Sequence, residues 1–173
     1  YAKRALARAQ LDKFDEAAND LEVLRRAGLE SNVYVSYVAG VNFFRQKKYE
    51  EAAQALEASK EDSAPYLPRE YYLASTYLAL GRIEQARSQA ELINSIAPRS
   101  PAAKRLLGAV QISQSELEAA TDVLNKAVQS SPGDAVMLRM LGYVALLLGN
   151  TADAVQYYQR ALTLDPDAVE VRD

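Results

Sequence analysis

Apolar residues recur along the chain at spacings of three, four and seven positions, in short runs separated by polar breaks. This spacing places apolar side chains on one face of an α-helix, so we predict a succession of short amphipathic helices. The breaks that divide the two helices of a pair are Lys47-Lys48, Gly81-Arg82, Ser115-Glu116 and Gly149-Asn150. The breaks that separate successive pairs are Ser63-Ala64-Pro65, Ala97-Pro98, Ser131-Pro132-Gly133-Asp134 and Asp165-Pro166.

The pairs repeat with a period of 34 residues. The period is carried by Ala52, Ala86, Ala120 and Ala154 and by Pro98, Pro132 and Pro166. Twelve residues before each of these alanines stands a small residue, namely Gly40, Ala74, Gly108 or Gly142. We expect the two helices of a pair to cross at these positions, because a larger side chain would push their axes apart. We also predict helix N-caps at Ser100, which precedes Pro101, and at Asp134.

These residues resemble the tetratricopeptide repeat, whose 34-residue unit has a leucine, a small residue, an aromatic, an alanine and a closing proline. The fullest examples are Leu73, Ala74, Tyr77, Ala86 and Pro98 in one repeat and Leu141, Gly142, Ala154, Tyr158, Ala161 and Pro166 in another. The resemblance implies an all-α fold, a right-handed superhelical solenoid of antiparallel helix pairs. Residues 1–173 would form a single array with repeats at 33–66, 67–100, 101–134 and 135–168.

The two ends of the chain depart from this pattern. Residues 1–32 read as a degenerate repeat, in which Phe14-Asp15-Glu16-Ala17 matches Tyr49-Glu50-Glu51-Ala52 at a spacing of 35. Arg4 and Arg8 occupy places that are apolar in the other repeats, so this end is expected either to fray or to pack on something missing. Residues 169–173 resemble the opening of a further repeat, and we expect the parent protein to have more repeats on both sides.

The resemblance also implies a binding site, on a concave face lined by the first helix of each pair. The candidate partner-binding residues on this face are Tyr34, Tyr37, Arg45, Tyr71, Ser75, Arg105, Arg139 and Tyr143. Two tyrosines followed by two arginines at equivalent positions would suit an extended peptide or helix with apolar anchors and a carboxylate. The alternative is that these side chains are ordinary surface. A neighbouring apolar set, Phe44, Leu78, Ile112 and Leu146, is expected to be packing between repeats.

The composition of the chain excludes several kinds of catalytic and metal site. The chain has 20 basic and 23 acidic side chains, a net charge of −3, and neither cysteine nor histidine. Thiolate nucleophiles, imidazole bases and zinc sites built on Cys or His are therefore excluded. Acidic pairs such as Glu50-Glu51 stand at helix starts or in turns, where the helix dipole and solvent stabilise their negative charge. We expect neither an enzyme nor a site for a metal or cofactor.

Nucleic acids and membranes are also poor candidates for partners. The basic pairs Arg25-Arg26 and Lys47-Lys48 are isolated in an acidic chain, so phosphate neutralisation would be weak. The apolar run from Met140 to Gly149 is far shorter than the roughly 20 residues of a membrane-spanning helix. We expect no nucleic-acid binding and no direct membrane insertion of this segment.

We therefore predict a non-catalytic scaffold that holds a protein or peptide partner in its groove. The alternative is a self-assembly module whose repeat ends stack end to end into homo-oligomers. The amino-acid sequences of residues 103–111 and 138–150 also resemble those of long bacterial repeat lipoproteins of exopolysaccharide export. That similarity implies a periplasmic parent, anchored at the outer membrane, that recruits export or modification proteins.

Overall fold

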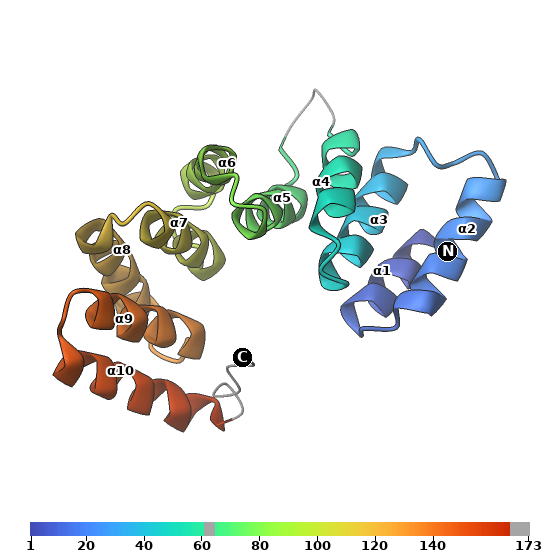
Figure 1. The fold of residues 1–173 in the computed structure, drawn as a ribbon. Helices are drawn as coiled ribbons and strands as arrows, with labels where there is room; N and C mark the ends of the chain where they lie inside the picture. Colours follow the sequence, from blue (N-terminus) through green and yellow to red (C-terminus); the bar gives the residue numbers. More distant parts are fainter. Residues whose placement is uncertain (61–64, 167–173) are drawn as a thin grey trace. The chain divides into compact units, whose positions relative to one another are not determined.

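The computed structural model describes residues 1–60 and 65–166, and within them the chain is built of α-helices alone. The helices follow one another in pairs (Figure 1). Their bounds are α1 Ala2–Gln10, α2 Phe14–Arg26, α3 Val33–Arg45, α4 Tyr49–Ala58, α5 Leu67–Ala79, α6 Ile83–Ile96, α7 Pro101–Ser113, α8 Leu117–Ser130, α9 Ala135–Leu147 and α10 Thr151–Leu164. The predicted all-α repeat fold is confirmed. Residues 169–173, expected to open a further repeat, lie outside the described residues.

The chain divides into two compact units, Tyr1–Gln89 and Ala90–Asp173, so the boundary falls inside α6. In the first unit α1 packs on α2 and α3, α3 packs on α4, and α4 packs on α5. In the second unit α7 packs on α8, and α9 packs on both α8 and α10. Each unit thus buries its apolar faces between antiparallel helices that are neighbours in sequence.

The turns inside the pairs lie at the predicted breaks. Lys47, Gly81, Ser115 and Gly149 all have a left-handed backbone, with φ between 60° and 79°. The following residue then donates its N–H to the helix that has just ended, as Asn150 does to the Ala145 carbonyl at 2.8 Å. This arrangement closes the last turn of the first helix and reverses the chain. Asp12, with φ 59°, repeats it between α1 and α2.

The predicted helix N-caps are also present. The Ser100 hydroxyl accepts a hydrogen bond from the Ala103 N–H, and the Asp134 carboxylate accepts one from the Met137 N–H at 3.0 Å. Asn32 caps α3 in the same way by accepting from the Tyr34 and Val35 N–H groups. The side chains thus satisfy donors that a helix start leaves without partners.

The small residues do mark close helix crossings. A Cβ atom added to Gly40 would lie 2.5 Å from the Leu56 Cγ, in the partner helix α4. A Cβ at Gly108 would lie 2.9 Å from the Leu124 Cδ2, and one at Gly142 would lie 2.9 Å from the Tyr158 Cζ. Glycine at these positions allows the close approach, because a Cβ atom would collide with the side chain that fills the crossing.

The apolar set expected to pack between repeats is only partly buried. The Phe44 ring lies 5.3 Å from the Tyr72 ring, and Ile112 packs against the core of the second unit. That core consists of Leu124, Ala127, Val128, Met137, Leu138, Leu141 and Ala161. The expectation that all four side chains pack between repeats is wrong for Leu146, which is 47% exposed. It lies near the end of α9, where the described residues provide no further helix to cover it.

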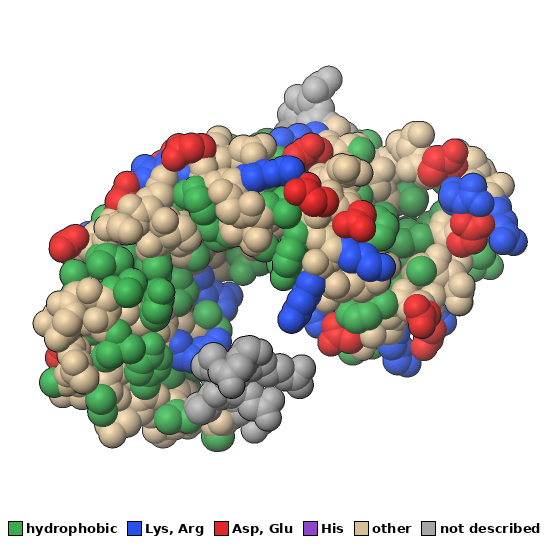
Figure 2. Space-filling view, viewed as in Figure 1, with side chains coloured by type: hydrophobic (Ala, Val, Ile, Leu, Met, Phe, Trp, Pro, Cys, Tyr) green, Lys and Arg blue, Asp and Glu red, His purple; other side chains and the backbone are tan. Residues whose placement is uncertain are grey.

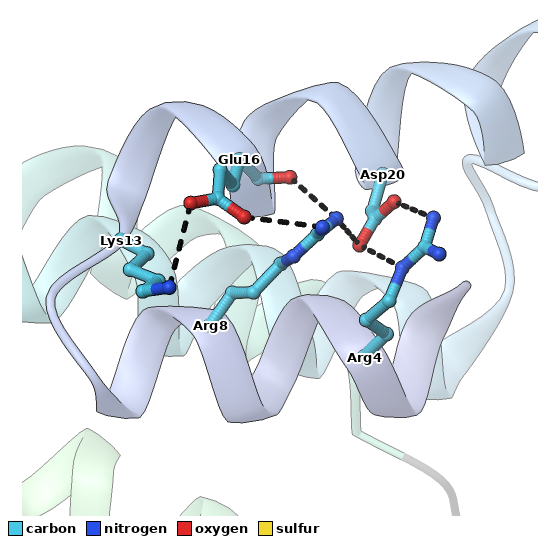
Figure 3. A network of polar contacts seen from close by, with 5 residues as sticks. All are labelled: Arg4, Arg8, Lys13, Glu16 and Asp20. Atoms are coloured by element: carbon cyan, nitrogen blue, oxygen red, sulfur yellow. Dashed lines mark hydrogen bonds and ion pairs between the residues drawn. The ribbon is translucent and has the colours of Figure 1, made fainter.

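The first helix pair combines buried alanines with a buried group of charged side chains. Arg4 and Arg8 both bond Asp20 on α2, which is only 3% exposed; the Arg4 Nε–Asp20 Oδ2 distance is 2.9 Å (Figure 3). Hydrogen bonding to Arg4 lowers the pKa of Asp20 to about 2. Helix α1 is therefore packed and paired, and the two arginines occupy apolar positions because their partner lies on the facing helix.

Candidate functional site

The aromatic candidates of the first unit belong to a connected group of rings. This tyrosine cluster comprises Tyr34, Tyr37, Tyr66, Tyr71 and Tyr72, from α3, the start of α5 and the residue before it. Tyr37 lies at its centre, with ring centroids 6.0 Å from Tyr34, 5.3 Å from Tyr66 and 6.3 Å from Tyr72. The contacts of Tyr37 with Tyr66 and Tyr72 are edge-on, and such contacts favour a rigid aromatic surface because a ring edge meets a neighbouring ring face.

Tyr37 itself is not available as a contact surface. Its side chain is 4% exposed, and burial raises its pKa well above the usual value. The fifth position of the repeat was expected to point at a ligand, but Tyr66 and Tyr72 cover it. Tyr66, which sequence reasoning missed, is 44% exposed and offers the ring that Tyr37 was expected to offer.

A pocket of about 380 Å³ opens beside this cluster. The tyrosine pocket is lined by Asn32, Val33, Tyr34, Tyr37, Ser59, Tyr66 and Arg69. It combines aromatic walls with a few polar groups, which is the usual composition of a small-ligand or side-chain pocket. The structure thus brings Tyr34 and Tyr37 together, whereas Tyr71 and Ser75, partly exposed on α5, do not line this pocket.

Arg69 is the buried charge of the tyrosine pocket. Its guanidinium pairs with Glu70 and donates to the Ser59 carbonyl at 2.9 Å, and both charged side chains are at most 5% exposed. A buried cation needs this pairing to offset its lost hydration. Sequence reasoning missed Arg69, because it stands at a repeat position that the resemblance does not assign to binding.

Arg45 is engaged within the first unit. Its Nε and Nη2 atoms both donate to Asp12 Oδ1, at 3.1 and 2.7 Å, so the end of α3 is tied to the α1–α2 turn. Figure 2 shows acidic and basic side chains gathered over α2 as well, where Glu22 accepts from Arg25 and Arg26. Ion pairs therefore satisfy much of the charge on this part of the surface.

The arginine candidates lie in the second unit. Arg105 is partly buried, and its Nε lies 3.7 Å from Asp134 Oδ2 without a hydrogen-bond partner among the residues described. It lines an open pocket of about 610 Å³, the arginine pocket, with Pro101, residues 131–136, Leu164 and Asp165. Arg139 is partly buried on α9, and Tyr143 is 49% exposed. The predicted continuous row from Tyr37 to Arg139 thus divides between two units, and its continuity stays a prediction.

Two further features concern metal ions and the membrane. The part of the chain that is described holds no group of three or more acidic side chains placed to bind a metal ion. None of the described helices combines the length and apolar character needed to cross a bilayer.

Comparisons with known proteins agree with the helix pairs. Models described as tetratricopeptide repeat match residues 2–68, 43–110 and 135–168, which together make up well over half of the chain. No curated protein matches the chain.

Solved structures of similar fold include "MamA MSR-1 C2", 19% identical over 96% of this chain and 95% of that chain, with a TM-score of 0.73. "MamA 41-end from Desulfovibrio magneticus RS-1" is 19% identical over 95% of each chain, with a TM-score of 0.76. YrrB, titled "a TPR protein with an unusual peptide-binding site", is 17% identical over 96% of this chain and 86% of that chain, with a TM-score of 0.71. The repeat period, the paired helices and the matching models together show that this chain belongs to the tetratricopeptide repeat family.

Proposed function

We propose that this chain is a non-catalytic scaffold that holds a peptide segment of a partner protein. Tetratricopeptide repeats generally mediate protein–protein interaction. In the proposed complex an apolar or aromatic side chain of the partner enters the tyrosine pocket. Arg105, in the second unit, offers a separate contact at the arginine pocket, suited to a carboxylate of a protein partner.

The observation that carries this proposal is the pocket on the tyrosine cluster. Tyr34 and Tyr66 present partly exposed rings over a buried Tyr37, so the surface is both apolar and held in place. Rigid tyrosines bind at low entropic cost, because few rotatable bonds are fixed on contact. Arg105 adds an anion partner, since its buried Nε still has a hydrogen to donate.

The test is a selection of displayed twelve-residue peptides on the full chain, followed by titration of the selected peptides in solution. We expect the double variant Tyr34→Ala, Tyr66→Ala to weaken binding by about tenfold or more. The matched control is Tyr143→Ala, which removes an exposed tyrosine of the second unit and should leave the apolar anchor in place. Equal loss in both variants, with intact helical circular dichroism, would contradict the proposal.

Self-assembly through the last helix pair is the second candidate. Its support is an exposed apolar surface on α9 and α10, visible as the hydrophobic side chains over these helices in Figure 2. The surface consists of Tyr143, Leu146, Leu147, Leu148, Val155, Leu162 and Leu164, which are 37–49% exposed. Exposed apolar residues gathered in one helix pair favour association, because contact removes them from water.

Sedimentation velocity over a concentration series tests this second candidate. We expect association to weaken in a Leu146→Ser, Leu162→Ser variant and to persist when Tyr34 and Tyr66 are replaced. A sedimentation coefficient that does not change with concentration would count against assembly. The predicted place in an exopolysaccharide export system, with a periplasmic parent, stays a prediction, because no comparison bears on it.

A further inference from the structure

A second groove lies in the first unit, away from the tyrosine pocket. It has a volume of about 500 Å³ and runs over α3 between α2 and α4. Ala18 and Leu21 of α2, Ala39 and Asn42 of α3, and Ala55 of α4 line its centre. We call it the α2–α3–α4 groove. The groove and the tyrosine pocket share no lining residue. Helix α3 contributes to both, but with different side chains, so the two sites are separate.

The centre of this groove contains an unsatisfied hydrogen-bond acceptor. Asn42 is 3% exposed, and its Oδ1 atom has no hydrogen-bond partner within the residues described. Buried side-chain oxygens normally accept at least one hydrogen bond, because losing hydration without compensation costs free energy. The lining of the groove therefore includes a buried amide oxygen that no described residue satisfies.

The fold does not need an asparagine at this position. The residues 34 positions apart from Asn42 are Thr76, Val110 and Val144, and all three are buried. The Thr76 hydroxyl donates to the Tyr72 carbonyl in its own helix, and the two valines carry no polar atom. Valine thus fills the same place in the second unit, so packing at this position does not require an amide.

Most charges of the groove lie toward its ends. Asp15 and Lys48 stand where α2 begins and α3 has ended, and Arg25 and Glu30 stand at the opposite end. Glu22 follows Leu21 and is paired with Arg25 and Arg26. No charged side chain lines the centre around Ala18, Ala39 and Asn42. An occupant with an uncharged centre and polar or charged flanks complements this distribution, because a charge at the centre would lose its hydration without gaining a partner.

We propose that the α2–α3–α4 groove binds an extended peptide segment of a partner protein, with a main-chain N–H donated to Asn42 Oδ1. An extended chain exposes main-chain N–H groups along its length, whereas those of a helix are already hydrogen-bonded within the helix. The lining of α2 from Phe14 to Arg25 corresponds to about 16 Å of helix, which about five extended residues would span. The central residue places an apolar side chain over the alanine floor beside Leu21.

The test uses the full chain with Tyr34→Ala and Tyr66→Ala as background, so that it is independent of the tyrosine pocket. A library of displayed seven-residue peptides is selected on this protein, and the selected peptides are titrated against further variants. Asn42→Val should weaken binding by about five- to tenfold while raising the melting temperature by about 2–4 °C. The matched control is Thr76→Val, the same change one repeat later, which should leave peptide affinity unchanged.

A second pair of variants tests the groove without touching the buried amide. Ala18→Glu places a charge at the uncharged centre and should abolish binding, whereas Asn19→Glu, on the same helix but outside the groove lining, should preserve it. The proposal is overturned if no peptide is recovered, if Asn42→Val binds as tightly as its parent, or if Asn42→Val lowers the melting temperature. Concentration-dependent dimerisation that Ala18→Glu abolishes would assign the groove to a second copy of the chain and also overturn it.

Discussion

The first and last helix pairs pack their two helices together through different side-chain chemistry. Between α1 and α2, two arginines converge on the buried carboxylate of Asp20. Between α9 and α10, Gly142 lets the helices approach until the Tyr158 ring fills the space where a side chain would stand. The same repeat geometry thus accommodates either paired charges or close apolar contact. The stability of the two pairs should therefore change differently when a side chain is enlarged, when a charge is removed or when the pH is lowered.

The same contrast applies to the surfaces. The first unit uses its charges internally, in Arg4, Arg8 and Arg45, and presents tyrosines and an uncharged groove centre. The second unit packs an apolar core and presents Arg105 beside an open pocket. Equivalent repeat positions can thus carry different side-chain chemistry without any change in the helix pairs.

The largest expected effect comes from filling the glycine crossing of the last pair. Gly142→Val should lower the free energy of unfolding by about 3 kcal/mol, because the added carbons would collide with the Tyr158 ring. The matched control is Gly133→Val, since a Cβ at Gly133 meets nothing within 4 Å. Urea unfolding followed by circular dichroism measures both. Similar losses for the two variants would mean that the crossing is not the constraint.

The corresponding change in the first pair is Asp20→Asn. It should cost about 2 kcal/mol, because two arginines lose a charged acceptor. Hydrogen exchange of the α1 and α2 amides should report the loss, while the amides of α9 and α10 keep their protection. Uniform loss of protection in all four helices would contradict a local role for the ion pairs.

The pH dependence should separate the two pairs as well. Pairing with Arg4 lowers the Asp20 pKa from 3.8 to about 2 in the folded chain. The folded-state pKa is depressed, so this stabilisation is present above pH 3.8 and is lost as pH falls through 2. We expect the stability difference between the parent and Asp20→Asn to shrink between pH 4 and pH 2. A difference that stays constant over this range would show that the carboxylate charge is unimportant.

The smallest expected effect concerns the turns. Ser115 holds a φ of 60°, which glycine adopts more easily, so Ser115→Gly should stabilise the α7–α8 pair by about 0.5–1 kcal/mol. The reverse change in the last pair, Gly149→Ser, should destabilise it by a similar amount, since Gly149 has a φ of 79°. Melting temperatures that move in the same direction for both variants would refute this account of the turns.

Much of the fold follows from short-range patterns. The positions of the turns and of the Gly40, Gly108 and Gly142 crossings were predicted, because glycine and polar breaks act locally and recur every 34 residues. The pairing of Arg4 with Asp20 was not, since its partners lie 16 residues apart on two helices. A sequence pattern does not specify which of several carboxylates an arginine will meet.

The candidate site was predicted less completely than the fold. Tyr34 does line a pocket, but Tyr37 is covered by Tyr66, whose position depends on the chain just before α5. Arg45 is tied to Asp12 across the first two pairs. The α2–α3–α4 groove was missed because the resemblance directs attention to the first helix of each pair, whereas this groove also requires α2 and α4. Burial and cross-helix partners decided each of these outcomes.

The most direct test of peptide binding by the tyrosine pocket is a titration of the full chain, labelled with ¹³C in its tyrosine rings, with a display-selected peptide. The 11 tyrosines report on both units at once. We predict saturable shifts in the ring signals of Tyr34 and Tyr66, with Tyr1 and Tyr143 nearly unmoved. Saturable binding that leaves Tyr34 and Tyr66 unshifted would contradict the assignment of the tyrosine pocket as the peptide site.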